Sequence, residues 1–177
     1  MNYKYIVDIL LVSNSKLDQL KKSVESVFAQ TFKNWRLLIV DDKTQDISAI
    51  RYLDEISKKS NVEVFHNEKK QGLTESLMTL NGIIDANYIA RIDSGDQWYP
   101  DKLSTQVEYL DQNQEIGLVG TQVQFVLEDG RIVRKSRFPE KFNDIRFEAI
   151  RNTGLFSHSS IVFRKSNLIY YDRLYFH

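Results

Sequence analysis

The feature that most constrains the fold is the alternation of two hydrophobic periodicities along the first two thirds of the chain. Nearly continuous apolar runs, typical of strands that are covered on both faces, occupy residues 6–12, 35–40, 62–65 and 88–92. After the first run, apolar residues recur at helical spacing, namely Leu17, Leu20, Val24, Val27 and Phe28. This alternation predicts an α/β fold with helices packed on a mainly parallel central sheet.

The expected helices separate these runs and continue beyond them. They cover residues 17–30, 47–57, 73–84, 100–112 and 145–151. Polar residues ahead of the first two helices, at 13–15 and at Thr44 and Asp46, are expected to cap them. The Asp-Gly turn at residues 128–130 predicts a hairpin between residues 117–127 and 132–134, and a further strand is expected at 161–163.

Length and composition limit the class of protein. Because domains typically contain about 100 to 200 residues, residues 1–177 are expected to form one domain. The 24 basic residues balance 24 acidic ones, so no overall electrostatic field favours binding to nucleic acid. The absence of cysteine excludes thiolate metal sites and fits a reducing cytoplasm. No run approaches the roughly 20 apolar residues of a membrane span, so we expect a protein that is soluble or at most peripheral to a membrane.

Short polar side chains stand where three predicted strands end. They are Ser13 and Asn14, then Asp41 and Asp42, then Asp93 and Asp96. In open α/β sheets, ligands bind outside the carboxyl ends of the strands, where the strand order reverses. Acidic side chains gathered there without matching bases indicate a cation or a hydrogen-bonded ligand.

The segment from Arg91 to Asp96 is the sharpest signal of this kind. Two carboxylates in one tight turn can hold a divalent cation beside a diphosphate, where the metal neutralises a leaving phosphate. Alternatively, Asp93 and Asp96 only build an Asx-type turn and cap the helix that begins near Pro100. Spacing alone leaves both interpretations equally open, because short acidic motifs are common by chance.

Asp41 and Asp42 also allow two interpretations. A carboxylate at a strand end can accept hydrogen bonds from a base or a ribose, but a simple strand-ending turn is commoner. In the loop at residues 67–72, Lys69 and Lys70 can reach phosphates or form a solvated basic turn.

Other chemistries have little support. His158 precedes an apolar run and is more typical of a structural histidine than of a ligand or a base. No G-x-G-x-x-G, P-loop, H-E-x-x-H or G-x-S-x-G pattern occurs. Dinucleotide oxidoreductases, P-loop nucleotidases, zincin peptidases and serine hydrolases are therefore unsupported.

Taken together, several segments resemble the family 2 glycosyltransferases over almost the entire chain. The similar segments are Ile9–Asn14, Ser23–Phe28, Gln30–Trp35 (Q-T-F), Leu38–Asp42 (I-V-D-D), Gly72–Thr74, Tyr88–Asp93, Pro100–Leu103 with Gln106, and Ser157–Lys165 (H-x-S-x-x-x-R). The resemblance implies a Rossmann-like GT-A domain for binding a nucleotide diphosphate sugar.

Carried over by position, the resemblance also implies the residues of the donor site. These are Leu11, Ser13, Asp42, Asp93, Ser94 and Asp96. Asp42 would contact the base, which is expected to be uracil. Asp93 and Asp96 would hold the ribose and a diphosphate bound to Mn²⁺ or Mg²⁺.

The same resemblance implies an activity and a place in the cell. The donor would be a nucleotide diphosphate sugar, and the acceptor a saccharide or a lipid-linked saccharide. The expected reaction is inverting transfer during assembly of bacterial surface polysaccharide. The expected location is the cytoplasm, at the inner face of the membrane.

Three departures from the family pattern qualify these expectations. Gly95 stands where relatives usually carry the metal-binding aspartate, so metal dependence rests on Asp96. Glu75 and Met78 stand where relatives commonly carry a basic residue and an asparagine, which would weaken diphosphate binding. The family's catalytic base lies in an E-D motif shortly after the position of Tyr170–Asp172, so it is expected beyond His177.

The second hypothesis is a catalytically inactive nucleotide-binding or interaction module. A nucleotidyltransferase with a similar core has less support, because the chain has no glycine-rich N-terminal loop with a basic residue.

Overall fold

The computed structural model describes residues 4–151 and 155–167. Its strands are β1 (Val7–Ser13), β2 (Trp35–Asp41), β3 (Val62–His66), β4 (Tyr88–Arg91), β5 (Leu118–Val119), β6 (Gln124–Val126), β7 (Ile132–Lys135) and β8 (Val162–Arg164). Its helices are α1 (Leu17–Phe28), α2 (Ile47–Ile56), α3 (Leu73–Met78), α4 (Lys102–Gln112) and α5 (Phe142–Ile150), with 3-10 turns η1 (His158–Ser160) and η2 (Lys165–Asn167).

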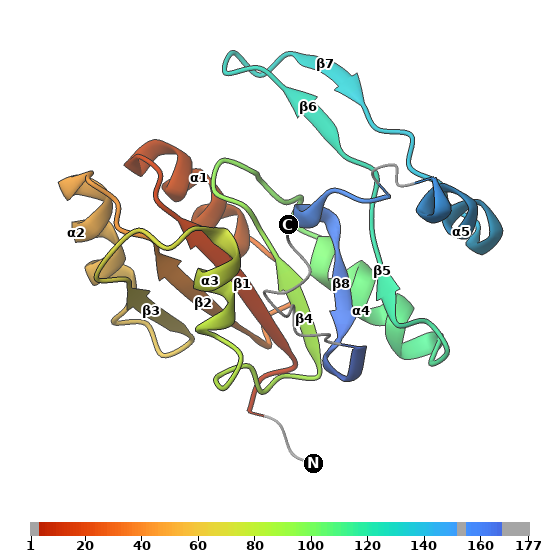
Figure 1. Cartoon of the computed structure of the whole chain (residues 1–177), viewed down its shortest axis with the longest axis horizontal. Coiled ribbons are helices and arrows are strands. Elements are labelled where there is room, and N and C mark those ends of the chain that lie inside the picture. Colours follow the sequence, from red (N-terminus) through yellow and green to blue (C-terminus); the bar gives the residue numbers. More distant parts are fainter. Residues whose placement is uncertain (1–3, 152–154, 168–177) are drawn as a thin grey trace.

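Six strands form one sheet in the order β3-β2-β1-β4-β8-β5 (Figure 1). Strands β1 to β4 pair in parallel, whereas β8 runs antiparallel to both β4 and β5. The expected α/β fold with a mainly parallel sheet is therefore confirmed. The strand order reverses at β1, because β2 and β3 lie on one side of it and β4 lies on the other.

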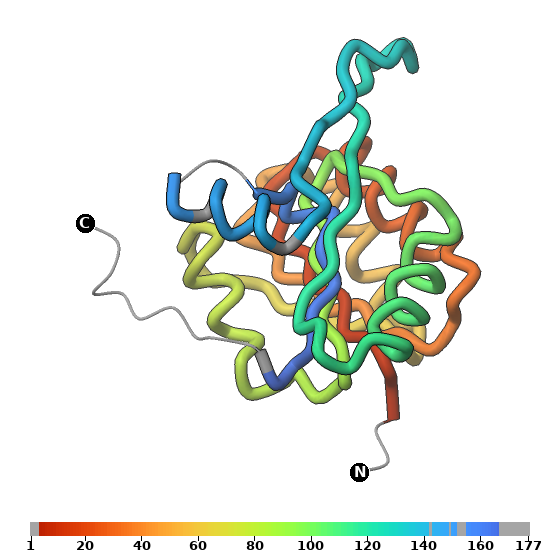
Figure 2. The backbone as a smooth tube through the Cα atoms, turned by 90° about the vertical axis from the view of Figure 1, so that its right-hand side faces the viewer, coloured from red at the N-terminus to blue at the C-terminus, as the bar shows by residue number. Residues whose placement is uncertain are grey.

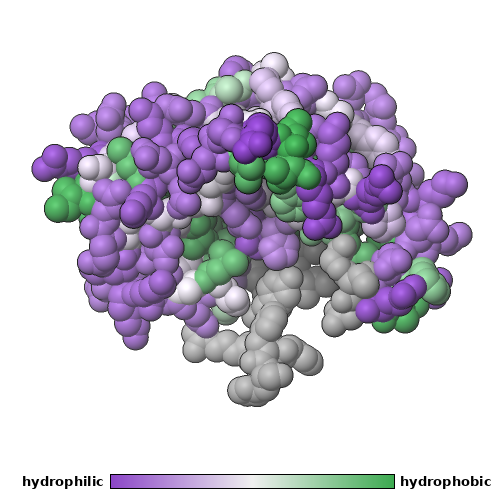
Figure 3. Space-filling view, turned by 90° about the horizontal axis from the view of Figure 1, so that it is seen from above, coloured by the Kyte–Doolittle hydropathy of each residue, from purple (hydrophilic) through white to green (hydrophobic). Residues whose placement is uncertain are grey.

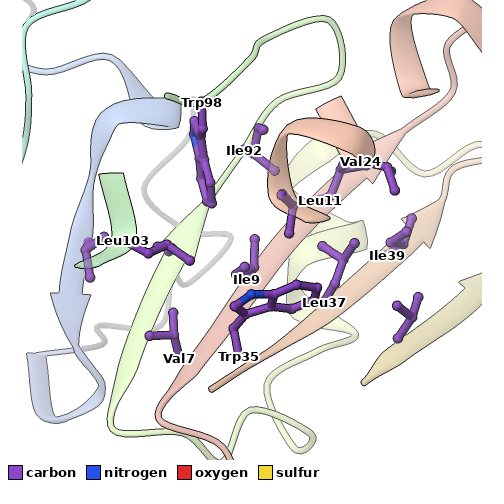
Figure 4. Close-up of a cluster of buried hydrophobic side chains, with 14 of the residues drawn as sticks. Val7, Ile9, Leu11, Val24, Trp35, Leu37, Ile39, Ile92, Trp98 and Leu103 are labelled. Carbon is purple, nitrogen blue, oxygen red and sulfur yellow. The ribbon is translucent and has the colours of Figure 1, made fainter. Parts of the chain in front are cut away.

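Each face of the sheet is covered by its own helices. Ile9 and Leu11 of β1 point to the face that packs against α1, α2 and α4 (Figure 4), whereas Leu10 points to the opposite face and packs with the segment around Leu80. Successive strand residues point to opposite faces. Because both faces are buried, the central strands need apolar residues at nearly every position.

A buried ion pair interrupts the apolar strands near their N-terminal ends. Asp8 is fully buried, and Arg36 of β2 donates to its two oxygens at 2.8 and 2.9 Å. The N–H groups of Asp85 and Ala86 donate to Asp8 as well, at 2.8 and 3.0 Å. A buried charge is tolerated only with such partners. Asp8 therefore ties β1, β2 and the chain before β4 together.

Strands β6 and β7 form a separate two-stranded sheet that projects from the body of the molecule (Figures 1 and 2). Its turn contains Gly130 at φ +85°, which confirms the predicted hairpin. Large apolar side chains on it, such as Phe125 and Val133, are exposed. The view from the side on which the hairpin projects shows apolar atoms gathered among hydrophilic ones (Figure 3). In the described ranges, no helix has the length and apolar character needed to span a bilayer.

Three expectations about local structure are wrong. The helix expected at residues 73–84 ends at Met78, and hydrogen-bonded turns follow it. These turns still bury Leu80 and Ile84, so apolar spacing there reflects burial without a continued helix. Residues 117–127 form two short strands, β5 and β6, in place of one. No side chain of residues 13–15 caps α1; instead, the first N–H of that helix donates to Asp46 Oδ2 at 2.9 Å.

Candidate functional site

The carboxyl ends of β1, β2 and β4 meet where the strand order reverses. Strand β1 ends at Ser13, β2 leads into Asp42, and β4 leads into Asp93. The Ser13 hydroxyl donates to Ser94 Oγ at 3.2 Å, so the ends of β1 and β4 are in contact. Because open α/β sheets bind ligands at such a reversal, this edge is the candidate site.

The residues from Asp93 to Asp96, called the 93–96 turn below, are held by two serines that are distant in sequence. The Asp96 N–H donates to the Asp93 carbonyl at 3.1 Å, and Gly95 has φ +100°, a conformation that favours glycine. Ser23 of α1 donates to the Asp96 carbonyl at 2.8 Å and accepts the Gly95 N–H at 2.9 Å. Ser159 of η1 accepts the Asp93 N–H at 2.9 Å and donates to Asp96 Oδ2.

Each of the two carboxylates of this turn has one oxygen that accepts hydrogen bonds and one that does not, among the described residues. Arg91 donates to Asp93 Oδ1 from Nε and Nη2, at 3.0 and 2.8 Å. Neither carboxylate caps α4, whose cap residue is Asp101, so the alternative of a helix cap is wrong. Within residues 4–151 and 155–167, Asp93 Oδ2 and Asp96 Oδ1 have no hydrogen-bond partner.

The described part of the chain contains no group of three acidic or histidine side chains arranged to hold a metal ion. Such a cage is not required beside a phosphate ligand. Mg²⁺ is usually held by one or two carboxylates together with substrate phosphates and waters. The second oxygens of Asp93 and Asp96 are available for such a role, and Arg91 already offsets the charge of Asp93 but not that of Asp96.

Asp42 holds the loop at residues 67–72 against the end of β2. Its Oδ1 accepts the Gln71 N–H at 2.7 Å and the Asn67 side-chain amide at 2.9 Å, and its Oδ2 accepts the Gly72 N–H at 2.9 Å. Burial alone raises the pKa of Asp42, but these hydrogen bonds outweigh it and hold the pKa below its ordinary value. Asp42 is therefore an ionised anchor for the loop.

An open cavity of about 510 Å³ lies along this loop. Its lining residues are His66, Asn67, Glu68, Lys69 and Gln71. The volume falls in the range of about 300–1,000 Å³ that is typical of small-molecule sites. His66 also lies beside the end of β2, with Nδ1 at 3.0 Å from Asp41 Oδ2. The lining does not include the 93–96 turn, so the cavity lies beside the 67–72 loop and not at that turn.

The remaining predicted residues fall into three groups. Leu11 is fully buried in the core (Figure 4), so any part it takes in the site rests on its main chain. Lys69, Lys70 and His158 are exposed. Residues 170–172 and the position expected for the base lie outside the described residues.

Sequence reasoning did not assign roles to Ser23 and Ser159. Ser23 lies on the buried face of α1 between Leu20 and Val24, and a polar residue in this apolar stripe was one available signal, beside the family-like segment Ser23–Phe28. Ser159 belongs to the H-x-S-x-x-x-R segment, where the sequence does not show which hydroxyl faces the turn.

Two other motif residues connect elements. Gln30 is fully buried, donates to the Tyr99 carbonyl at 2.8 Å and accepts the Leu103 N–H at 3.0 Å, which joins α1 to α4. Arg164 of β8 donates to the Leu110 carbonyl at 2.6 Å, near the end of α4. Basic side chains commonly bond the last carbonyls of a helix. These residues of the motifs are structural.

Known proteins share this architecture and parts of this sequence. The mannosyltransferase PcManGT from Pyrobaculum calidifontis, solved with GDP-Man and Mn²⁺, superposes with a TM-score of 0.67 over 93% of this chain and 46% of its own, at 16% identity. At that identity the likeness shows the shared GT-A fold.

Related sequences and a family model show to which protein family the chain belongs. The uncharacterized glycosyltransferase MJ1057 of Methanocaldococcus jannaschii is 28% identical over 89% of this chain and 54% of its own. The UDP-Glc:alpha-D-GlcNAc-diphosphoundecaprenol beta-1,3-glucosyltransferase WfgD of Escherichia coli is 28% identical over 85% of this chain and 57% of its own. The chain thus spans little more than half the length of these relatives. The model of glycosyl transferase family 2 matches residues 9–169, and the chain therefore belongs to that family.

Proposed function

We propose that this chain is the donor-binding domain of an inverting glycosyltransferase that uses a UDP-sugar. The observation that carries the proposal is the convergence of Ser13, Asp42 and the 93–96 turn at the reversal of strand order. Membership of the family and the UDP-Glc named for WfgD support the choice of donor.

The residues at this edge suit different parts of such a donor. The nucleoside lies along the loop that Asp42 holds, beside the open cavity whose lining includes the polar side chains of His66, Lys69 and Gln71. The ribose and diphosphate lie over Ser13 and the 93–96 turn, where Asp96 and Asp93 would hold Mn²⁺ or Mg²⁺. Such a cation would offset the charge of the departing diphosphate.

The transfer itself needs a group that accepts a proton. An acceptor hydroxyl attacks the anomeric carbon as the bond to the diphosphate oxygen breaks, and a carboxylate removes the proton of that hydroxyl. The family pattern places this base after the described residues. The proposed acceptor is a saccharide or lipid-linked saccharide of bacterial surface polysaccharide, at the cytoplasmic face of the membrane. The diphosphoundecaprenol acceptor named for WfgD supports this choice.

Thermal melting with nucleotides tests the proposal. The chain is melted alone, with UDP, with UDP and Mn²⁺, and with GDP and Mn²⁺. A ligand at about 100 times its dissociation constant adds roughly 2.7 kcal/mol to the folded state. We expect a shift with UDP that exceeds the shift with GDP and increases with Mn²⁺. A cooperative melt that no nucleotide moves would refute the proposal.

A further inference from the structure

We infer that Ser159 is a positioning residue that orients the Asp96 carboxylate for a divalent cation. Through Ser159, the segment before β8 would set the cation affinity of the donor site. The inference rests on the proposed function, because it takes Asp96 as the cation ligand.

The direction of the Ser159 hydroxyl follows from its partners. A serine hydroxyl has one hydrogen to donate and two lone pairs to accept with. The Asp93 N–H, which can only donate, occupies a lone pair at 2.9 Å. The hydrogen of Ser159 therefore goes to the carboxylate oxygen Asp96 Oδ2. One hydroxyl thus fixes the main chain at the start of the turn and the side chain at its end.

The burial of the two residues makes this contact effective. Ser159 is 6% exposed, whereas Asp96 is an exposed residue whose carboxylate would otherwise rotate in solvent. With Oδ2 held by the hydroxyl, Oδ1 is the oxygen left for a cation. Partners that orient a metal ligand commonly change metal affinity by about tenfold to a hundredfold.

Ser159 is itself held in place by a residue that follows the 93–96 turn. The indole Nε1 of buried Trp98 donates to the Ser159 carbonyl at 2.7 Å. Both ends of the segment 93–98 therefore bond to one residue of η1. The 3-10 turn η1 has its own internal hydrogen bond, in which the Ser160 N–H donates to the Ser157 carbonyl at 2.9 Å.

Ser23 provides a useful contrast. Within the 93–96 turn its hydroxyl contacts only main-chain atoms, those of Asp93, Gly95 and Asp96, and its other partner is the Gln19 carbonyl of α1. Loss of Ser23 would loosen the turn as a whole, whereas loss of the Ser159 hydroxyl would also free the carboxylate of Asp96. The two serines therefore separate support of the loop from orientation of the ligand.

The test measures UDP affinity by calorimetry with and without Mn²⁺, together with the EPR signal of bound Mn²⁺. The variants are Ser159→Ala, Ser159→Thr, which keeps the hydroxyl, and Ser160→Ala. Ser160 is the matched control, because its buried hydroxyl donates to the Ser157 carbonyl at 2.7 Å and does not touch the turn.

For Ser159→Ala we expect the gain in UDP affinity from Mn²⁺ to fall by about tenfold to a hundredfold. Its UDP affinity without metal should fall by a much smaller factor, because Ser23 still holds the main chain of the turn, and the other two variants should keep the wild-type gain. A purely structural role would instead lower the melting temperature and both affinities together. If Ser159→Ala does not melt cooperatively, Ser159→Cys, a weak donor of similar size, replaces it and should lose the gain.

The failures are distinguishable. A Ser159→Ala protein that keeps the wild-type gain from Mn²⁺ would overturn the inference and leave the proposed function intact. A wild-type chain that binds UDP with no gain from Mn²⁺ would overturn it as well, while donor binding stands. A wild-type chain that binds no nucleotide would refute the proposed function itself.

Discussion

Replacement of Asp42 by asparagine should release the 67–72 loop and lower stability by a predictable amount. The best orientation of the new amide keeps its oxygen on Asn67 and Gln71 and turns its NH₂ toward the Gly72 N–H. One bond to a charged acceptor is lost, and two become neutral. Bonds to charged groups contribute about 1.5–3 kcal/mol and neutral ones about 0.5–1.5, so the lower ends of these ranges give a loss of about 3.5 kcal/mol. Because a neutral amide also costs less to bury than a carboxylate, we expect a net loss of about 3 kcal/mol.

Urea unfolding of wild type and Asp42→Asn measures this loss, with Glu68→Gln as the control because Glu68 is an exposed carboxylate of the same loop. A loss of about 3 kcal/mol corresponds to roughly 6–12 °C in the melting temperature of a domain of this size. Hydrogen exchange should show faster exchange at the Gln71 and Gly72 amides. An Asp42→Asn protein as stable as the control would refute the role of Asp42 as the anchor.

The pH dependence of this difference has a definite sign. The pKa of Asp42 lies below its ordinary value of 3.8 in the folded state, so its stabilisation is complete above that value. As the pH falls below 3.8, the unfolded state takes up a proton first and the stabilisation is lost. The gap between wild type and Asp42→Asn should therefore narrow below about pH 4. A gap that widens on acidification would contradict the assignment.

Three further substitutions test the fold and the site. Gly95→Asp restores a carboxylate to the turn but places it at φ +100°, so we expect a loss of about 1–3 kcal/mol in urea unfolding, and an unchanged midpoint would refute the strain. Asp8→Asn breaks the buried pair with Arg36 and should cost about 3–5 kcal/mol; a loss near zero would show that the pair is dispensable. Burial lowers the pKa of Lys102 to about 7, so between that pH and its ordinary 10.5 the unfolded chain binds the extra proton and wild-type stability rises with pH. Lys102→Met should remove this slope and be the more stable protein at pH 7. Equal slopes in the two proteins would contradict the burial of the Lys102 amino group against Trp98.

The sequence predicted the central strands well for a simple physical reason. A parallel strand covered on both faces must be apolar at nearly every position, so its limits are visible in the sequence. Each of the four parallel strands, β1 to β4, begins and ends within one residue of the expected place. The segment after Met78 was mispredicted because turns that bury Leu80 and Ile84 produce the same spacing as a helix. Apolar periodicity reports burial, and it reports helical geometry only when the local chain also permits a helix.

The site was predictable at the level of strand ends and not at the level of contacts. The rule on strand ends needs only the sequence and the sheet order, and it selected Asp42, Asp93 and Asp96. The partners of the 93–96 turn, Ser23 and Ser159, are 72 and 66 residues from Gly95 and Asp93, so only the packed structure brings them together. The functional roles of all these residues stay predictions until binding is measured.

The hydrogen bonds of Asp42, Asp93 and Asp96 indicate that the 67–72 loop and the 93–96 turn contribute differently to ligand binding. Asp42 is buried, and its carboxylate already accepts three hydrogen bonds from the 67–72 loop, so that loop is organised before any nucleotide arrives. The 93–96 turn is equally well held in its main chain, but each of its two carboxylates keeps an oxygen without a partner among the described residues. A preorganised loop contributes to affinity without an ordering cost. The two unpartnered carboxylate oxygens, in contrast, contribute to nucleotide affinity only when a cation binds to them. Nucleotide binding by this domain should therefore have a part that is independent of metal, set by the Asp42 loop, and a part that depends on metal, set by Asp96.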